Sequence, residues 1–312
     1  METRKFIKVF VDGDVIVYRC GFAAERNTYT YTDESGEVTE GLTHKELRAL
    51  TEERGEGTVE KIHTVEPVEF ALANVKNQLE QITADVADGF DVDPKRVHLL
   101  VMLSGPDNFR YEHATLRPYK GGRDPDHKPV HGPAILDYLD RKHDTMYSVN
   151  EEADDMMGYL QVNALHRGEM SCIATIDKDL DMIPGPHFNF NTNRFYYVEP
   201  DDGDRFFYYQ LITGDSTDNI GGVPRMGPKK AEEFRQKWQK EDASVRRMYE
   251  DVLELYVQHY GPNAEEVLLE NARLLWIRRA PDELWTPPEE SNNENNIHQR
   301  GEGDAVYSQP AG

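Results

Sequence analysis

Eight carboxylates fall into four blocks along the sequence, and each block lies where a strand is expected to end or a helix to begin. The eight are Asp12, Glu152, Asp154, Asp155, Asp177, Asp179, Asp215 and Asp218. So many acids at one edge of a sheet would repel one another unless cations lay among them. Oxygen ligands suit Mg²⁺ or Mn²⁺, and two such ions about 4 Å apart can activate water and stabilise a leaving oxygen in phosphodiester cleavage. The pattern predicts a two-metal hydrolytic site.

Each block alone has an ordinary structural explanation. Acids in a first helical turn complement the helix dipole, and Asp-Gly or Asp-Lys-Asp is a common turn sequence. A single block would favour that explanation, whereas four blocks together favour a metal site. An acidic Ca²⁺-binding module is a further alternative, and it predicts ion binding without affinity for nucleic acid.

A basic and aromatic stretch lies between Asn108 and Pro129. Its members are Arg110, Arg117, Lys120, Arg123 and Lys128, interleaved with Phe109, Tyr111 and Tyr119. Cations that follow a backbone and rings that stack on bases suit a single-stranded nucleic acid. A solvated loop explains this stretch alone equally well.

The segment GGVPRMGPKKA, residues 221–231, lies between two expected helices. Such a turn exposes backbone N–H groups at a helix start, where a phosphate can dock, and Lys229 and Lys230 add positive charge. A plain helix hairpin with glycine caps is the alternative. The placement of the glycines and prolines favours phosphate binding.

The elements that must position these residues alternate between strands and helices. Strands are expected at 7–11, 97–103 and 171–176, a hairpin at 28–39, and helices at 67–86 and 151–166. This order predicts an α/β fold with a mainly parallel central sheet flanked by helices, whose functional crevice lies at the carboxyl ends of the strands. We expect an α/β core at 1–210, a helical region at 211–285 and a polar, disordered tail at 286–312.

The composition limits the class of protein. Cys20 and Cys172 are too few and too scattered for a disulfide framework or zinc site and are expected to be buried. No signal peptide or membrane span is evident, which predicts a soluble, cytoplasmic monomer. The formal net charge of -23 argues against a simple nucleic-acid binder. Many acids nevertheless lie between residues 34 and 66 and in the tail, and bound cations would reverse the local sign at the acid blocks.

Five motifs together resemble the 5′-nuclease family. In chain order they are VFVDGD, NFRYEHATLRPYKGGR, EEADDM, ATIDKDLD and GDSTDNIGGVPRMGPKKA. The family includes phage 5′→3′ exonucleases, the nuclease domain of bacterial DNA polymerase I, and flap endonucleases. The resemblance covers about residues 6 to 235 and is strongest to stand-alone phage-type exonucleases, because no polymerase follows. Residues 27–66 and the tail have no family counterpart.

The resemblance implies a PIN-like fold with a helical arch at about 106–130 and a helix–three-turn–helix motif. It implies a two-metal 5′→3′ exonuclease or 5′-flap endonuclease of phage-type DNA replication, in the host cytoplasm if the protein is phage-encoded. The implied first metal site is Asp12, Glu152 and Asp154, and Asp155 lies between two ions as a catalytic residue. The implied second site is Asp177, Asp179, Asp215 and Asp218, and Mn²⁺ could replace Mg²⁺ at both.

The same resemblance implies the DNA contacts. Lys120 is the catalytic lysine at the scissile phosphate, Tyr119 is a stacking aromatic, and Phe109, Arg110 and Arg123 complete the arch contacts. The turn from Gly222 to Lys230 is implied to grip duplex DNA and to hold a K⁺ ion. Its contact residues are Gly222, Val223, Gly227, Lys229 and Lys230.

Two positions depart from the family pattern. Ser104 stands where an aspartate is expected after the second strand, so either Asp107 supplies the charge from a shifted position or the first site is one ligand short. Arg225 replaces a glycine usual in the turn. Two alternatives to a DNA nuclease stay open: cleavage of RNA in RNA–DNA hybrids, and non-catalytic binding of DNA structures by a protein whose metal site has decayed, which Ser104 would favour.

Overall fold

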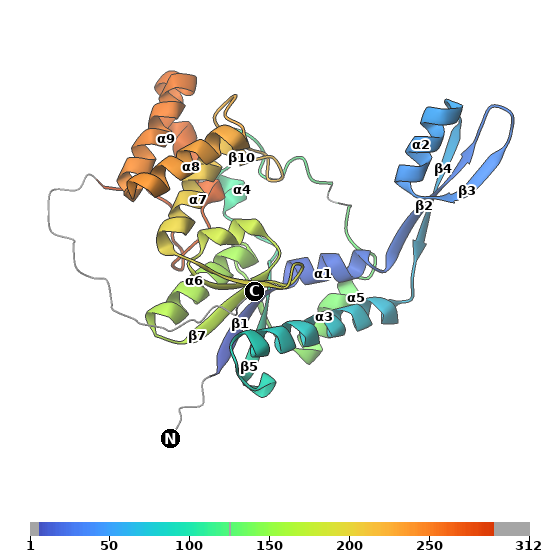
Figure 1. The fold of residues 1–312 in the computed structure, drawn as a ribbon, viewed down its shortest axis with the longest axis horizontal. Helices are drawn as coiled ribbons and strands as arrows, with labels where there is room; N and C mark the ends of the chain where they lie inside the picture. The colour runs from blue at the N-terminus through green and yellow to red at the C-terminus, as the bar shows by residue number, and fades with distance from the viewer. Residues whose placement is uncertain (1–5, 125, 290–312) are drawn as a thin grey trace.

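A six-stranded sheet forms the centre of the computed structural model, which describes residues 6–124 and 126–289 (Figure 1). The strand order is β6-β5-β1-β7-β8-β9, and all neighbouring pairs are parallel except β8 with β9. The strands are β1 (Ile7–Asp12), β5 (Val97–Leu103), β6 (Asp144–Tyr147), β7 (Met170–Thr175), β8 (Gly185–Asn189) and β9 (Arg194–Val198). This confirms the predicted α/β class with a mainly parallel sheet.

The two faces of the sheet carry different helices. On one face, Val9 and Val11 of β1 pack with α1 (Gly13–Phe22), α3 (Val68–Gly89) and α5 (Gly132–Lys142). On the other face, Phe10 packs with α6 (Ala153–His166) and with the helices that follow the sheet. Because side chains alternate along a strand, the run IKVFVD builds both cores at once. Cys20 and Cys172 are buried and unpaired, as predicted.

The helical region continues the second core. Its elements are α7 (Pro200–Thr213), β10 (Gly214–Asp215), β11 (Ile220–Gly221), α8 (Pro228–Glu241), α9 (Val245–Tyr260) and α10 (Ala264–Leu275). Short 3₁₀ turns occur at η1 (Pro94–Arg96), η2 (Lys178–Met182) and η3 (Gly261–Asn263). The expected boundary at 210/211 falls inside α7, and one hydrophobic cluster joins these helices to the sheet. The helical region therefore packs against the sheet rather than standing apart from it.

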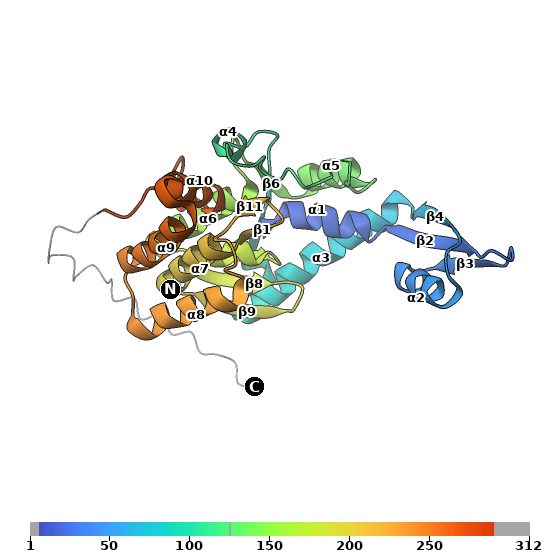
Figure 2. The same cartoon turned by 90° about the horizontal axis from the view of Figure 1, so that it is seen from above.

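Residues 25–65 form an extension at the far end of α1 and α3 (Figures 1 and 2). It consists of β2 (Glu25–Thr32), β3 (Val38–Leu42), α2 (His44–Arg54) and β4 (Thr58–Val65), with strand order β3-β2-β4. The antiparallel pairing of β2 with β3 confirms the predicted hairpin. Within this fully described stretch, Tyr31 is the one buried side chain. The extension thus adds almost nothing to either core.

The segment expected to form a helical arch is helical only at α4 (Arg110–His113) among its described residues. Pro118 and the pair Gly121-Gly122 interrupt any helix, and Lys120 between them has a left-handed backbone (φ 55°). The expected tail lies outside the described residues from position 290 onward. No helix in the described ranges is both long and apolar enough to cross a membrane.

Candidate active site

A pocket of about 820 Å³ opens where the carboxyl ends of β1 and β7 meet the start of α6. Seven of the eight predicted acids line it, namely Asp12, Glu152, Asp154, Asp177, Asp179, Asp215 and Asp218. Asp14, Ser104, Tyr119, Lys120 and Arg123 line it as well. The structure thus gathers four sequence blocks that lie up to about 200 residues apart.

Backbone capping fixes the acids that follow the strands. Asp12 ends β1 and accepts hydrogen bonds from Val15 N (3.0 Å) and Thr175 Oγ1 (2.7 Å). Asp177 caps η2 by accepting a hydrogen bond from Asp179 N (2.9 Å). Because β1 and β7 are neighbours and parallel, these carboxylates reach the same end of the sheet.

Burial and mutual repulsion oppose ionisation of the inner acids. Burial, followed by repulsion from Asp14 and Asp177, raises the pKa of Asp12 to about 7. The pKa of Asp154 is raised well above its ordinary value by burial and then by the charges of Asp12 and Asp177. Burial and the charge of Asp177 raise the pKa of Asp179 to about 6. Cations in the pocket would relieve this repulsion, so the donor set fits divalent metal ions.

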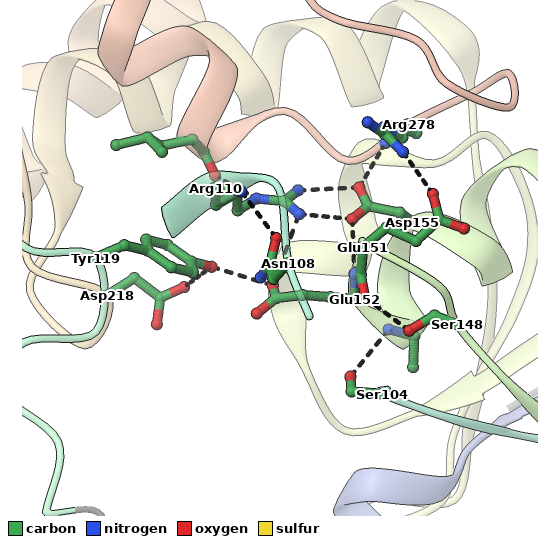
Figure 3. Close-up of polar contacts among 12 residues, drawn as sticks. Ser104, Asn108, Arg110, Tyr119, Ser148, Glu151, Glu152, Asp155, Asp218 and Arg278 are labelled. Atoms are coloured by element: carbon green, nitrogen blue, oxygen red, sulfur yellow. Dashed lines mark hydrogen bonds and ion pairs between the residues drawn. The ribbon is translucent and has the colours of Figure 1, made fainter. Parts of the chain in front are cut away.

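The carboxylates of the pocket do not form a compact set of metal ligands. Among the described residues, no three His, Cys, Asp or Glu side chains are arranged so as to hold a metal. Two of the predicted ligands instead face the arch segment (Figure 3). Glu152 is paired with Lys120 Nζ, and Asp218 is paired with Arg123.

Tyr119 joins the same two acids. Its hydroxyl lies 3.0 Å from Glu152 Oε2 and 2.8 Å from Asp218 Oδ2, so the two carboxylates share its one proton, and its side chain is buried. Tyr119 nevertheless lines the pocket, and its expected stacking role stays a prediction. Its neighbour Tyr111, packed edge-on against it, is 57% exposed and is the available ring.

Asp155 does not face the pocket, which contradicts its expected place between two ions. It is fully buried and accepts two hydrogen bonds from Arg110 (2.5 and 2.9 Å) and one from Arg278 N (3.0 Å). Although burial opposes ionisation, the Arg110 guanidinium holds the pKa of Asp155 below its ordinary value. Both carboxylate oxygens are therefore occupied by protein donors, in a structural ion pair (Figure 3).

The expected DNA contacts of Arg110 and Phe109 are wrong for the same reason. Arg110 is 2% exposed, and it also donates to the carbonyls of Leu274 (2.9 Å) and Trp276 (2.7 Å). Phe109 is buried, and the guanidinium carbons of Arg110 and Arg278 lie 4.7 and 4.1 Å from the centroid of its ring. These residues tie α4 to α6 and to the end of α10.

Asp14 is a pocket residue that the sequence interpretation missed. It lies in the first turn of α1 and accepts hydrogen bonds from Ser104 N (3.2 and 3.3 Å). Burial raises the pKa of Asp14 against the effect of these hydrogen bonds. Asp107, considered as a substitute for the missing acid, is exposed and does not line the pocket. The motif VDGD carried the signal, since its second aspartate lies only two positions after the first.

The glycine turn joins β11 to α8. Gly222 lies so close to other backbone that an added Cβ would come within 2.3 Å of Thr213 C, whereas an added Cβ at Gly227 would meet nothing within 4 Å. Val223 is buried, and its N–H donates to Ile212 O (2.8 Å), so its side chain is not a surface contact. Lys229 and Lys230, in the first turn of α8, are exposed.

No protein-family model matches the sequence. DNA polymerase I of Bacillus subtilis (strain 168) is 31% identical over 248 residues, a match that spans 74% of this chain and 23% of that relative. The flap endonuclease Xni of Shewanella sediminis (strain HAW-EB3) is 25% identical over 191 residues, which cover 58% of this chain and 73% of that protein. The exodeoxyribonuclease of Enterobacteria phage T3 is 27% identical over 209 residues, which cover 65% and 64% of the two chains. This chain therefore spans under a quarter of the polymerase but about two thirds or more of the two nucleases.

A crystal structure of the bacteriophage T5 flap endonuclease, in a pseudo-enzyme-product complex with DNA and metal ions, has a similar fold. The TM-score is 0.52 at 18% sequence identity, and the alignment covers 86% of this chain and 88% of the T5 chain. At this level of identity the likeness shows the fold.

Proposed function

This chain belongs to the 5′-nuclease family, and we propose that it is a metal-dependent 5′→3′ exonuclease and 5′-flap endonuclease that hydrolyses DNA phosphodiester bonds. The observation that carries the proposal is the pocket. Seven acids that match the family motifs line it together with Lys120 and Arg123. The pKa values of Asp12 and Asp154 are raised by burial and by neighbouring carboxylates. The pocket therefore has too little positive charge to balance its acids, which is a deficit that cations would fill.

Two Mg²⁺ ions are the cofactors we propose. Asp12, Glu152 and Asp154 would hold the first, and Asp177, Asp179, Asp215 and Asp218 the second. When bound, the ions supply Lewis-acid activation of water and charge stabilisation at the phosphate. Asp155 is no longer in this set, since Arg110 occupies its carboxylate.

Lys120 and Arg123 pair with two of the proposed metal ligands. They neutralise Glu152 and Asp218, two acids that the proposal assigns to metals. The Lys120 ammonium and the Arg123 guanidinium line the same pocket and would pair there with a phosphate of the substrate. The left-handed backbone at Lys120 directs its side chain and its N–H, which donates to Asp218 O (3.0 Å), toward the same acids.

The glycine turn is proposed to hold the duplex part of the substrate. Gly227 caps α8, and Lys229 and Lys230 follow in its first turn, so N–H groups and two cations face solvent together. Arg225, in the left-handed region (φ 65°) that a glycine would occupy without strain, adds a third cation. A K⁺ ion bound by carbonyl groups of this turn is a further part of the proposal.

Cleavage of a 5′-labelled flap duplex tests the function. We expect cutting at or near the junction with Mg²⁺ or Mn²⁺ and none with chelator, and we expect Asp177→Ala to abolish cutting while DNA binding stays measurable. Full activity of Asp177→Ala would overturn the assignment. Tight binding without cutting under either metal would identify a non-catalytic binder. Preferential cutting of an RNA–DNA hybrid of the same sequence would move the substrate class to RNA.

A further inference from the structure

The carboxyl end of β5 carries a hydroxyl where its neighbour β1 carries a carboxylate. Ser104 follows Leu103, the last residue of β5, and β5 pairs in parallel with β1, so that Asp12 lies beside Met102. The Ser104 Oγ accepts a hydrogen bond from Ala153 N (3.0 Å), which fixes the start of α6. Ser104 therefore positions the helix that presents Glu152 and Asp154, and it brings no charge of its own.

Asp14 brings a carboxylate to the same place from the neighbouring element. Both of its oxygens lie within 3.3 Å of Ser104 N, so its carboxyl group occupies space directly beside the Ser104 side chain. It lines the pocket together with Asp12, Glu152 and Asp154, the acids assigned to the first metal.

The packing of α1 leaves this carboxylate little freedom. A Cβ added to Gly13 would come within 2.5 Å of Met102 O, so the first turn of α1 presses directly on the end of β5. In the described part of the chain, Asp107 is the other acid near Ser104 in sequence, and it lies outside the pocket.

We propose that Asp14, in the first turn of α1, supplies to the first metal position the carboxylate that Ser104, directly after β5, lacks. The proposal rests on the proposed metal-dependent function of this pocket. It assigns Asp14 as a metal-site residue, and it makes Ser104 a positioning residue that orients both Asp14 and the start of α6.

Mutation can move the carboxylate from position 14 to position 104. We would compare the wild-type protein with Asp14→Asn, Asp14→Ser, Ser104→Asp and the double variant D14S/S104D. Mn²⁺ binding without DNA would be followed by titration calorimetry, and flap cleavage would be measured in parallel. Asp14→Asn keeps an oxygen to accept from Ser104 N and loses the charge alone. Asp107→Asn, an acid of the same loop outside the pocket, is the matched control.

Asp14→Asn and Asp14→Ser should weaken the binding of one Mn²⁺ by about tenfold or more. Even mutation of a residue that only hydrogen-bonds to a metal ligand typically lowers metal affinity by that factor. The double variant D14S/S104D should recover most of the loss, and Asp107→Asn should match the wild type. Wild-type Mn²⁺ affinity in Asp14→Asn would overturn the proposal. So would a double variant that folds, by its circular dichroism, yet binds no better than Asp14→Ser.

Failure of the proposed function and failure of the role of Asp14 would give different experimental results. A wild-type protein that never cuts the flap would refute the nuclease assignment, while the Mn²⁺ titrations would still decide the place of Asp14. A wild type and an Asp14→Asn variant that cut and bind metal equally well would refute the role of Asp14 alone.

Discussion

Asp154 and Asp155 are adjacent in sequence and have opposite electrostatic environments. Asp154 faces the pocket, where burial and other carboxylates raise its pKa well above the ordinary value. Asp155 points the other way, where Arg110 holds its pKa below the ordinary value despite burial. One step along the helix, a rotation of about 100°, therefore separates an acid suited to a cation from an acid that already has one.

Neutralising each of the two should change stability in opposite directions. In chelator at pH 8, Asp154→Asn should raise the free energy of unfolding, because it removes repulsion from Asp12 and Asp177. Asp155→Asn should lower it by about 3–5 kcal/mol, because it leaves the buried guanidinium of Arg110 without its counter-charge. Urea denaturation measures both. Asp155→Asn with unchanged stability but lost metal binding would restore Asp155 as a ligand.

Sequence reasoning at this scale identified the acids and misplaced several of their neighbours. The four acid blocks could be predicted because each follows a recognisable strand or opens a helix. The roles of Arg110 and Asp155 could not, because Arg110 is held by carbonyls of Leu274 and Trp276, more than 160 residues away. Asp14 was overlooked because its partner, Ser104, directly follows β5 and comes 90 residues later in the sequence.

At the scale of elements, the buried strands were the most predictable. The run VHLLVML was predicted as a strand at 97–103 and forms β5 with the same bounds. The strands β8 and β9 and most of the extension were not predicted. β4 is exposed along its whole length, and α2 buries no side chain, so neither has the periodic apolar pattern that marks an element in sequence.

The two glycines of the turn should respond differently to one added methyl group. Gly222→Ala should destabilise the protein by about 2 kcal/mol or more and weaken duplex binding, because its Cβ would overlap the backbone of Thr213 and Gly214. Gly227→Ala should change the free energy of unfolding by less than about 1 kcal/mol, because its Cβ meets open space and its φ is −77°. Thermal melting and duplex-binding titrations measure both. Equal effects of the two changes would contradict the packing described for Gly222.

At the scale of the whole molecule, the net charge of -23 and the affinity proposed for DNA are compatible because charge is unevenly placed. The extension carries an excess of acids and projects away from the pocket at the far end of α1 and α3 (Figure 2). The pocket itself combines acids with Lys120 and Arg123. Total charge in the sequence could not predict this separation, which depends on how the elements are arranged.

The raised pKa values make stability depend on pH in a defined direction. Unfolded aspartates ionise near pH 4, whereas folded Asp12 does so at about 7 and Asp179 at about 6. Between these values the folded state binds more protons than the unfolded state, so its stability falls as pH rises. We expect the melting temperature of the metal-free protein to fall from pH 5 to pH 8. Mg²⁺ should recover more of the loss at pH 8 than at pH 5, because ligands must be deprotonated to bind it.

Two histidines, the partly buried His143 and the buried His187, act in the opposite direction and call for a control. Burial lowers the pKa of His143 and His187, so their contribution to stability grows as pH rises. Asp12→Asn isolates the carboxylate effect, because it leaves both histidines in place. Its melting temperature in chelator should fall less steeply from pH 5 to pH 8 than that of the wild type, and Mg²⁺ should stabilise it less at pH 8. Parallel pH profiles for the two proteins would mean that Asp12 ionises as an ordinary aspartate, and the deficit of positive charge in the pocket would then be absent.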